Sequence, residues 1–237
     1  MILIRKRALL TLALCGCSVL GMASVLWAGL AAQPAFAPVE RTPVVWVIDP
    51  GHGGEDGGAV SESGLQESGV NLEVSLRLRE ILRFSGQQTR MTRDGDVSVC
   101  DEGLPTIRAR KASDIRNRVT LVNETAGAVL VSIHQNSLPS SPETHGAQAF
   151  WNAEGETLAG RVQEQLNAVI NTHRAKESRQ IPKTIYLMNH VTVPAILVEC
   201  GFLSNAAETA LLMELDYQTK LAAVIAAGCL GAGEETP

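Results

Sequence analysis

Short apolar runs alternate along this chain with longer amphipathic segments, and that alternation limits the possible folds more than any other feature. Strands that alternate with helices predict an α/β layered domain around a buried, largely parallel sheet. The strands that we predict cover residues 44–48, 88–92, 129–133, 147–151, 185–188 and 195–198. The predicted helices cover residues 70–85, 112–126, 156–171, 205–213 and 216–230.

Residues 70–85 require a choice between two periods. Apolar residues at positions 72, 74, 76 and 78 alternate with polar ones, which is the period of a strand. The segment is nevertheless long and rich in Leu, Glu and Arg, and Gly86 supplies a stop signal. We therefore predict a helix here. In the next helix, Ser113 or Asp114 is the predicted cap.

The first 37 residues have the features of an export signal. Three basic residues at positions 5–7 precede an almost unbroken apolar run, and Ala35-Phe36-Ala37 provides a small-x-small cleavage site. About 20 apolar residues suffice to span a bilayer, so an uncleaved membrane anchor is the alternative. We expect a signal or anchor at 1–37, a linker at 38–43, one folded domain at 44–231 and a tail at 232–237.

The charge balance argues against nucleic acid as a partner. The chain has 20 Lys and Arg against 25 Asp and Glu. Three of the basic residues lie in the signal, which leaves 17 against 25 and a net charge of −8. Nucleic acid binding needs basic patches, whereas an acidic chain is compatible with a small or polymeric extracytoplasmic substrate. Cys100, Cys200 and Cys229 remain outside the signal without CxxC spacing, so neither a disulfide framework nor a zinc–cysteine site is indicated.

Three predicted strands end in residues that can carry chemistry. The first runs into "DPGH", which ends at His52, and two later strands run into His134 and Glu199. Glu67 begins the first helix, after a glycine-rich loop. Sites in open α/β sheets collect at the carboxyl ends of strands. Two histidines and a carboxylate form a common catalytic zinc shell, beside which Glu199 would act as general base and then general acid.

Each of these residues also has a purely structural interpretation. The histidines can be hydrogen-bonded residues at strand ends, Glu67 can interact with a helix dipole, and Glu199 can belong to a buried salt bridge. The glycines alone can form an ordinary tight turn. A phosphate-binding loop is disfavoured, because the stretch lacks a G-K-[ST] ending and carries Glu55 and Asp56.

Taken together, the motifs resemble the zinc-dependent N-acetylmuramoyl-L-alanine amidases of bacteria, of the amidase-3 type. The matching stretches lie in the family's order between about residues 44 and 230: "VIDPGHGGEDGGA", "GLQESGVNLEVSLRLREIL", "MTRDGD", "DIRNRVTLVNE", "LVSIHQNS" and "PAILVECGFLSN". By this resemblance, His52, Glu67 and His134 match the ligands of one zinc ion per chain, and Glu199 matches the catalytic glutamate. The resemblance also implies a twisted, mixed, largely parallel sheet of about six strands with helices on both faces.

The reaction implied by the resemblance is hydrolysis of the amide that joins the lactyl group of N-acetylmuramic acid to L-alanine of the stem peptide. Residues 44–231 would then be the amidase catalytic domain. The details "DIRNRVTLVNE", "SIHQNS" and "YLMNHVTVPAILVECGFLSNA" look most like the germination-specific branch, which acts in spore-cortex maturation before muramic-δ-lactam formation. The alternatives are another zinc peptidoglycan hydrolase, such as a carboxypeptidase, and a partner-dependent binding module.

The expected partner is peptidoglycan, with an activator protein as an open alternative and membrane contact only through the N-terminal segment. The expected location is exported and extracytoplasmic, in the cell wall or the forespore intermembrane space. Asp49 should position the loop or orient His52. Arg93 and Asn136 should either contact substrate or pair locally. Cys200 follows the catalytic glutamate, where the family usually has a hydrophobic residue, and is interpreted as a small buried hydrophobe.

Overall fold

The computed structural model describes residues 43–231. The predicted signal or anchor and the tail lie outside these residues, as does nearly all of the predicted linker. No helix in the described part has the length and apolar character needed to cross a membrane. The described strands are β1 (Val45–Pro50), β2 (Gln88–Met91), β3 (Ala128–Asn136), β4 (Gln148–Trp151), β5 (Arg179–Gln180) and β6 (Ala195–Phe202). The helices are α2 (Glu67–Phe84), α3 (Ile107–Asn123), α4 (Glu156–Val169), α5 (Tyr186–His190), α6 (Ala206–Leu212) and α7 (Leu215–Leu230).

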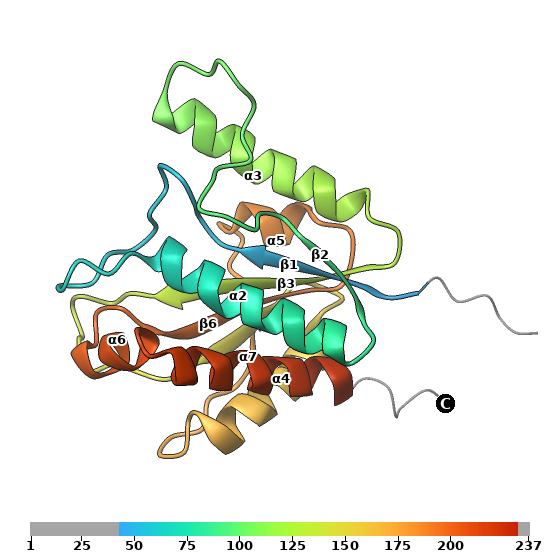
Figure 1. The fold of residues 1–237 in the computed structure, drawn as a ribbon. Helices are drawn as coiled ribbons and strands as arrows, with labels where there is room; N and C mark the ends of the chain where they lie inside the picture. The colour runs from blue at the N-terminus through green and yellow to red at the C-terminus, as the bar shows by residue number, and fades with distance from the viewer. Residues whose placement is uncertain (1–42, 232–237) are drawn as a thin grey trace, which may run out of the picture. The chain divides into compact units, whose positions relative to one another are not determined.

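The six strands form one sheet in the order β2-β1-β3-β6-β4-β5. Strands β2, β1, β3 and β6 pair in parallel, whereas β4 runs antiparallel to β6 and β5 runs parallel to β4. The prediction of a mixed, largely parallel sheet is therefore confirmed. Since β1, β3 and β6 are parallel neighbours, their carboxyl ends meet at one edge of the sheet, where α2 also begins (Figure 1).

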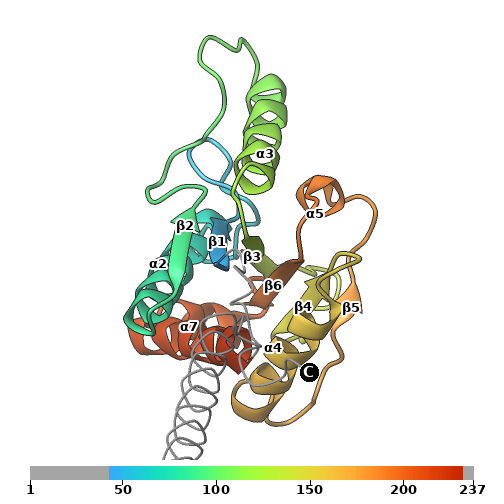
Figure 2. The same ribbon diagram turned by 90° about the vertical axis from the view of Figure 1, so that its right-hand side faces the viewer.

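Helices cover both faces of the sheet, as predicted (Figure 2). Helices α2, α4 and α7 pack on one face around the larger apolar cluster, and α3 and α5 pack on the other around a smaller one. Adjacent residues of β1 point to opposite faces of the sheet: Val47 packs in the smaller cluster and Ile48 in the larger one. Gly228 of α7 allows close helix contact, since a Cβ there would lie 2.6 Å from the Cα of Val162.

Helix α2 resolves the ambiguous period at residues 70–85. Its fully buried apolar residues recur every fourth position, at Val70, Val74, Leu78 and Leu82, while the leucines at 72 and 76 are only partly buried. The stop signal is also confirmed. Gly86 has φ +79°, and the next amide, that of Gln87, donates to the Leu82 carbonyl (3.0 Å), as in a Schellman motif.

Two predictions for secondary structure were wrong. Residues 185–188 do not form a strand, because α5 occupies Tyr186–His190; an apolar run this short cannot distinguish a strand from a helix. Helix α3 starts five residues before the predicted position, at Ile107, where Thr106 Oγ1 accepts from the Ala109 amide (3.1 Å) as the N-cap. The two-residue strand β5 was not predicted.

Candidate metal centre

The carboxyl ends of β1 and β3 bring His52 and His134 to the first residue of α2, Glu67. One ligand atom from each of the three side chains lies within 4.8 Å of the other two. His134 Nδ1 is 2.9 Å from Glu67 Oε1, and His52 Nε2 is 3.3 Å from Glu67 Oε2. The structure thus assembles the two nitrogens and one carboxylate that the sequence motifs single out.

The glycines of the loop allow these side chains to approach one another. A Cβ on Gly51 would collide with the ring of His134, and a Cβ on Gly58 would lie 2.5 Å from Glu67 Oε2 and 2.8 Å from His52 Cδ2. His52 itself has φ +63°, the single positive value among non-glycine residues that the structure describes. The interpretation of the glycines as an ordinary tight turn is therefore insufficient, because the loop also holds His52 in a left-handed backbone conformation.

Asp56 orients the imidazole of His52. Its Oδ2 lies 2.9 Å from His52 Nδ1, and its Oδ1 accepts from Lys111 Nζ (2.7 Å). A carboxylate can only accept, so Nδ1 carries a proton toward Asp56, and Nε2 is the ring nitrogen that faces Glu67. Histidine ligands of metals are commonly held by a carboxylate in this way.

Backbone and amide donors hold the carboxylate of Glu67. Its Oε2 accepts from the Ala59 amide (2.9 Å), and its Oε1 accepts from the Gln135 amide (3.1 Å) and from Asn71 Nδ2 (3.2 Å). Burial would raise the pKa of Glu67, but the hydrogen bonds from His134 and His52 hold it well below its usual range. Burial would likewise lower the pKa of His52, but Glu67 and Asp56 raise it to about 9. Metal-free His52 therefore carries a proton that a divalent cation would replace, and the donor set of the site fits zinc.

Glu199 lies beside this cluster without being part of it. It pairs in register with His134 across β3 and β6. Its Oε2 is buried and has no hydrogen-bond partner in the described structure. Burial raises the pKa of Glu199 to about 7, against the opposing charge of His134. A carboxyl that titrates near neutrality can both accept and release a proton at physiological pH.

The remaining candidates have structural contacts. The carboxylate of Asp49 accepts from Arg118, Thr92 and Ser132 and forms no hydrogen bond with His52. Of its two predicted roles, Asp49 therefore positions the loop and does not orient His52. Arg93 is buried and donates only to backbone carbonyls. Asn136 caps the amide of the next residue (2.8 Å). Cys200 is fully buried, and burial raises the pKa of its thiol well above the usual range, as expected for an inert residue.

Sequence reasoning missed the functional part of Asp56 and the whole contribution of Arg118. The only local signal for Asp56 was its place four residues after His52. Arg118 lies on α3 and donates to the carbonyl of His52, a residue 66 positions earlier in the sequence. No local sequence pattern predicts such a contact.

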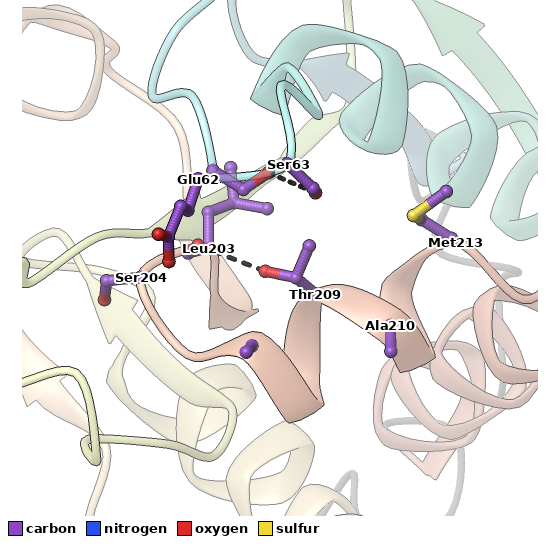
Figure 3. Close-up of a pocket in the computed structure, with 9 residues that line it drawn as sticks. Glu62, Ser63, Leu203, Ser204, Thr209, Ala210 and Met213 are labelled. Carbon is purple, nitrogen blue, oxygen red and sulfur yellow. Dashed lines mark hydrogen bonds between the residues drawn. The ribbon is translucent and has the colours of Figure 1, made fainter.

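A separate hollow of about 410 Å³ lies between the segment 61–63, which leads to α2, and helix α6 (Figure 3). None of the four predicted site residues lines it. Three of its hydroxyl groups bond within the wall: Ser61 Oγ is 3.0 Å from Ser63 Oγ, and Thr209 Oγ1 donates to the Leu203 carbonyl (3.1 Å). The side chains that could hold a metal ion therefore lie outside this hollow.

Comparisons with known proteins show the family of this chain. Residues 47–230 match the family described as N-acetylmuramoyl-L-alanine amidase. Over 188 residues the chain is 43% identical to the germination-specific N-acetylmuramoyl-L-alanine amidase of Bacillus subtilis (strain 168), with 77% of each chain covered.

Solved structures give the same result. The CwlD amidase from Clostridioides difficile, solved in complex with the GerS lipoprotein, superimposes with a TM-score of 0.76 at 32% identity, over 79% of this chain and 97% of that one. The amidase AmiC2 of Nostoc punctiforme superimposes with a TM-score of 0.64 at 30% identity, over 81% of this chain and 98% of that one. The chain therefore belongs to the N-acetylmuramoyl-L-alanine amidase family and is a peptidoglycan hydrolase that cleaves an amide bond.

Proposed function

We propose that the chain is a zinc-dependent amidase that separates the lactyl group of N-acetylmuramic acid from L-alanine of the stem peptide. His52, Glu67 and His134 are its zinc ligands, one ion per chain, and Glu199 is its catalytic residue. The observation that carries the proposal is the convergence of three ligand atoms within 4.8 Å beside Glu199, whose Oε2 is buried. The family match favours this activity over the carboxypeptidase and the binding module.

Zinc supplies a Lewis acid for the scissile carbonyl and for the attacking water when it is bound. Asp56 retains the Nδ1 proton of His52, so Nε2 is the ligand atom once a divalent cation displaces its proton. Ionised Glu199 accepts a proton from the attacking water and then donates it to the leaving amine of L-alanine. A pKa near 7 suits both steps, because neither protonation state is strongly disfavoured at neutral pH.

The biological setting that we propose is the spore cortex. The 43% identity to a germination-specific amidase supports it, as does the structural similarity to CwlD. Removal of the stem peptide would there precede formation of muramic-δ-lactam. The action is extracytoplasmic, with residues 1–37 as the export signal or anchor, 38–43 as a linker and 44–231 as the catalytic domain. Because CwlD was solved in complex with a lipoprotein, we extend the proposal to an activator protein as a partner of this chain.

Substitution of Glu199 by glutamine tests the chemical assignment. Purified sacculi treated with the wild-type protein should gain free lactyl carboxyl and free L-alanine amino groups. Glu199→Gln should retain one equivalent of zinc and lose about 10²- to 10⁴-fold in rate, the usual contribution of a general acid or base. Glu164→Gln, at an exposed position of α4, is the matched control and should behave as wild type. An active Glu199→Gln protein would show that another group moves the proton.

Spore chemistry tests the biological assignment. Deletion of the gene should yield spores whose cortex contains no muramic-δ-lactam, and expression of the wild-type protein should restore it. Glu199→Gln should fail to restore it. Normal lactam in the deletion strain would contradict the cortex role without affecting the amidase activity.

A further inference from the structure

Two buried arginines hold the backbone of the loop that carries His52. Arg118 of α3 is 1% exposed, and its Nη1 donates to Asp49 Oδ1 (2.7 Å) and to the Pro50 carbonyl (2.8 Å). Its Nη2 donates to the carbonyl of His52 itself (2.7 Å). Asp114, one helical turn earlier, accepts from Nε (2.6 Å) and fixes the plane of the guanidinium.

Arg93 holds the same loop from the other direction. Its Nε donates to the Pro50 carbonyl (2.9 Å) and its Nη2 to the Gly51 carbonyl (3.0 Å). A further bond from Nη2 reaches the Ser68 carbonyl in the first turn of α2 (2.9 Å). Within residues 43–231 no carboxylate forms an ion pair with Arg93. The two guanidinium groups together donate hydrogen bonds to three successive backbone carbonyls, those of residues 50–52.

This arrangement opposes the strain at His52. A residue with a Cβ is disfavoured in the left-handed conformation, so the surrounding structure has to hold it there. The bond from Arg118 to the His52 carbonyl fixes the peptide that follows this strained residue. Only a planar fork of donors can reach the Asp49 carboxylate, the Pro50 carbonyl and the His52 carbonyl at once.

We propose that Arg118 is a positioning residue for the metal, because its guanidinium holds the His52 backbone in the conformation that aims Nε2 at Glu67. Without this contact the loop relaxes toward ordinary backbone angles, and the ligand must be reordered each time zinc binds. The inference rests on the proposed zinc site. It concerns metal affinity, which can be measured without substrate.

The test compares Arg118→Lys with Arg116→Lys in the full chain. Lysine keeps the charge of Arg118 but loses the fork, whereas Arg116 is an exposed neighbour on the same helix. Zinc affinity is measured by competition with a chromophoric chelator, and the melting temperature of the metal-free protein is measured separately. We expect Arg118→Lys to bind zinc about 10- to 100-fold more weakly, the range found for residues that orient metal ligands. Arg116→Lys should match wild type.

A merely structural role would give a different pattern. Metal-free Arg118→Lys would then melt at a lower temperature, while its folded fraction bound zinc as tightly as wild type, and that result would overturn the proposal. Co²⁺ substitution gives a second readout, since a displaced His52 should change the visible absorption bands of Arg118→Lys but not those of Arg116→Lys. Arg118→Met should weaken zinc binding further; if it does not fold, Arg118→Lys decides. A wild-type protein that binds no zinc would refute the metal site and this inference together, whereas equal affinity in wild type and Arg118→Lys refutes the inference alone.

Discussion

Replacement of Asp49 by asparagine should destabilise the protein, because Asp49 is a buried charge at the base of the site loop. The residue is 1% exposed, and its carboxylate accepts from Arg118 (2.7 Å), Thr92 (2.6 Å) and Ser132 (2.7 Å). Asparagine keeps the shape and one acceptor oxygen. It loses the charge opposite Arg118 and turns an NH₂ group toward a donor.

The pKa of Asp49 sets the size of the effect. Burial would raise this pKa, but the charge of Arg118 and the hydrogen bonds from Ser132 and Thr92 lower it from 3.8 to about 2. At 1.36 kcal/mol for each pKa unit, this difference corresponds to about 2–3 kcal/mol of stability. The folded-state pKa is the lower one, so the contribution is complete above about pH 4 and is lost as the pH falls through 2.

Urea unfolding of the metal-free protein measures the effect. At pH 7, Asp49→Asn should unfold with a free energy about 2–3 kcal/mol below that of wild type, and the difference should shrink as the pH is lowered from 4 toward 2. Asp94→Asn, at an exposed position in the next loop, is the control and should stay within about 0.5 kcal/mol. A difference below about 0.5 kcal/mol at pH 7 would refute the reasoning, as would one that does not change with pH.

Three further predictions concern the metal site. Gly58→Ala should lower zinc content, since the added Cβ would lie 2.5 Å from Glu67 Oε2. Gly64→Ala is the control and should retain the metal, because Gly64 also has a positive φ but a Cβ there would meet no atom within 4 Å. Equal zinc content in the two variants would contradict this prediction. Zinc at about 100 times its dissociation constant should stabilise wild type by about 2.7 kcal/mol in thermal unfolding, and His134→Ala should show no such gain. The rate constant kcat/KM should rise about tenfold per pH unit up to about pH 7 and then level, because Glu199 must be ionised to accept a proton and burial raises its pKa to about 7. Zinc content checked at each pH separates this titration from metal loss, and a flat profile between pH 5 and 7 would argue against Glu199.

Local patterns in the sequence were enough to predict the class of fold. Buried parallel strands are continuous apolar runs in the sequence, and amphipathic helices separate them. The order of strands and helices can therefore be predicted from the apolar pattern of each segment. The pattern failed where a segment was too short to have a period. Residues 185–188 are apolar enough for a strand, yet α5 forms there. Such short segments take the structure that packing allows.

The sequence by itself singled out the residues that we propose carry the chemistry. His52, His134 and Glu199 follow apolar strands, and parallel strands bring their carboxyl ends to one edge, so motif and topology together predict a shared site. Only the tertiary structure decided how that site is held. It made Asp56 rather than Asp49 the partner of His52, and it brought Arg118 from α3 onto the His52 carbonyl. Contacts of this kind depend on how a helix packs against a sheet and on the direction of one side chain, and neither is encoded in the residues next to it.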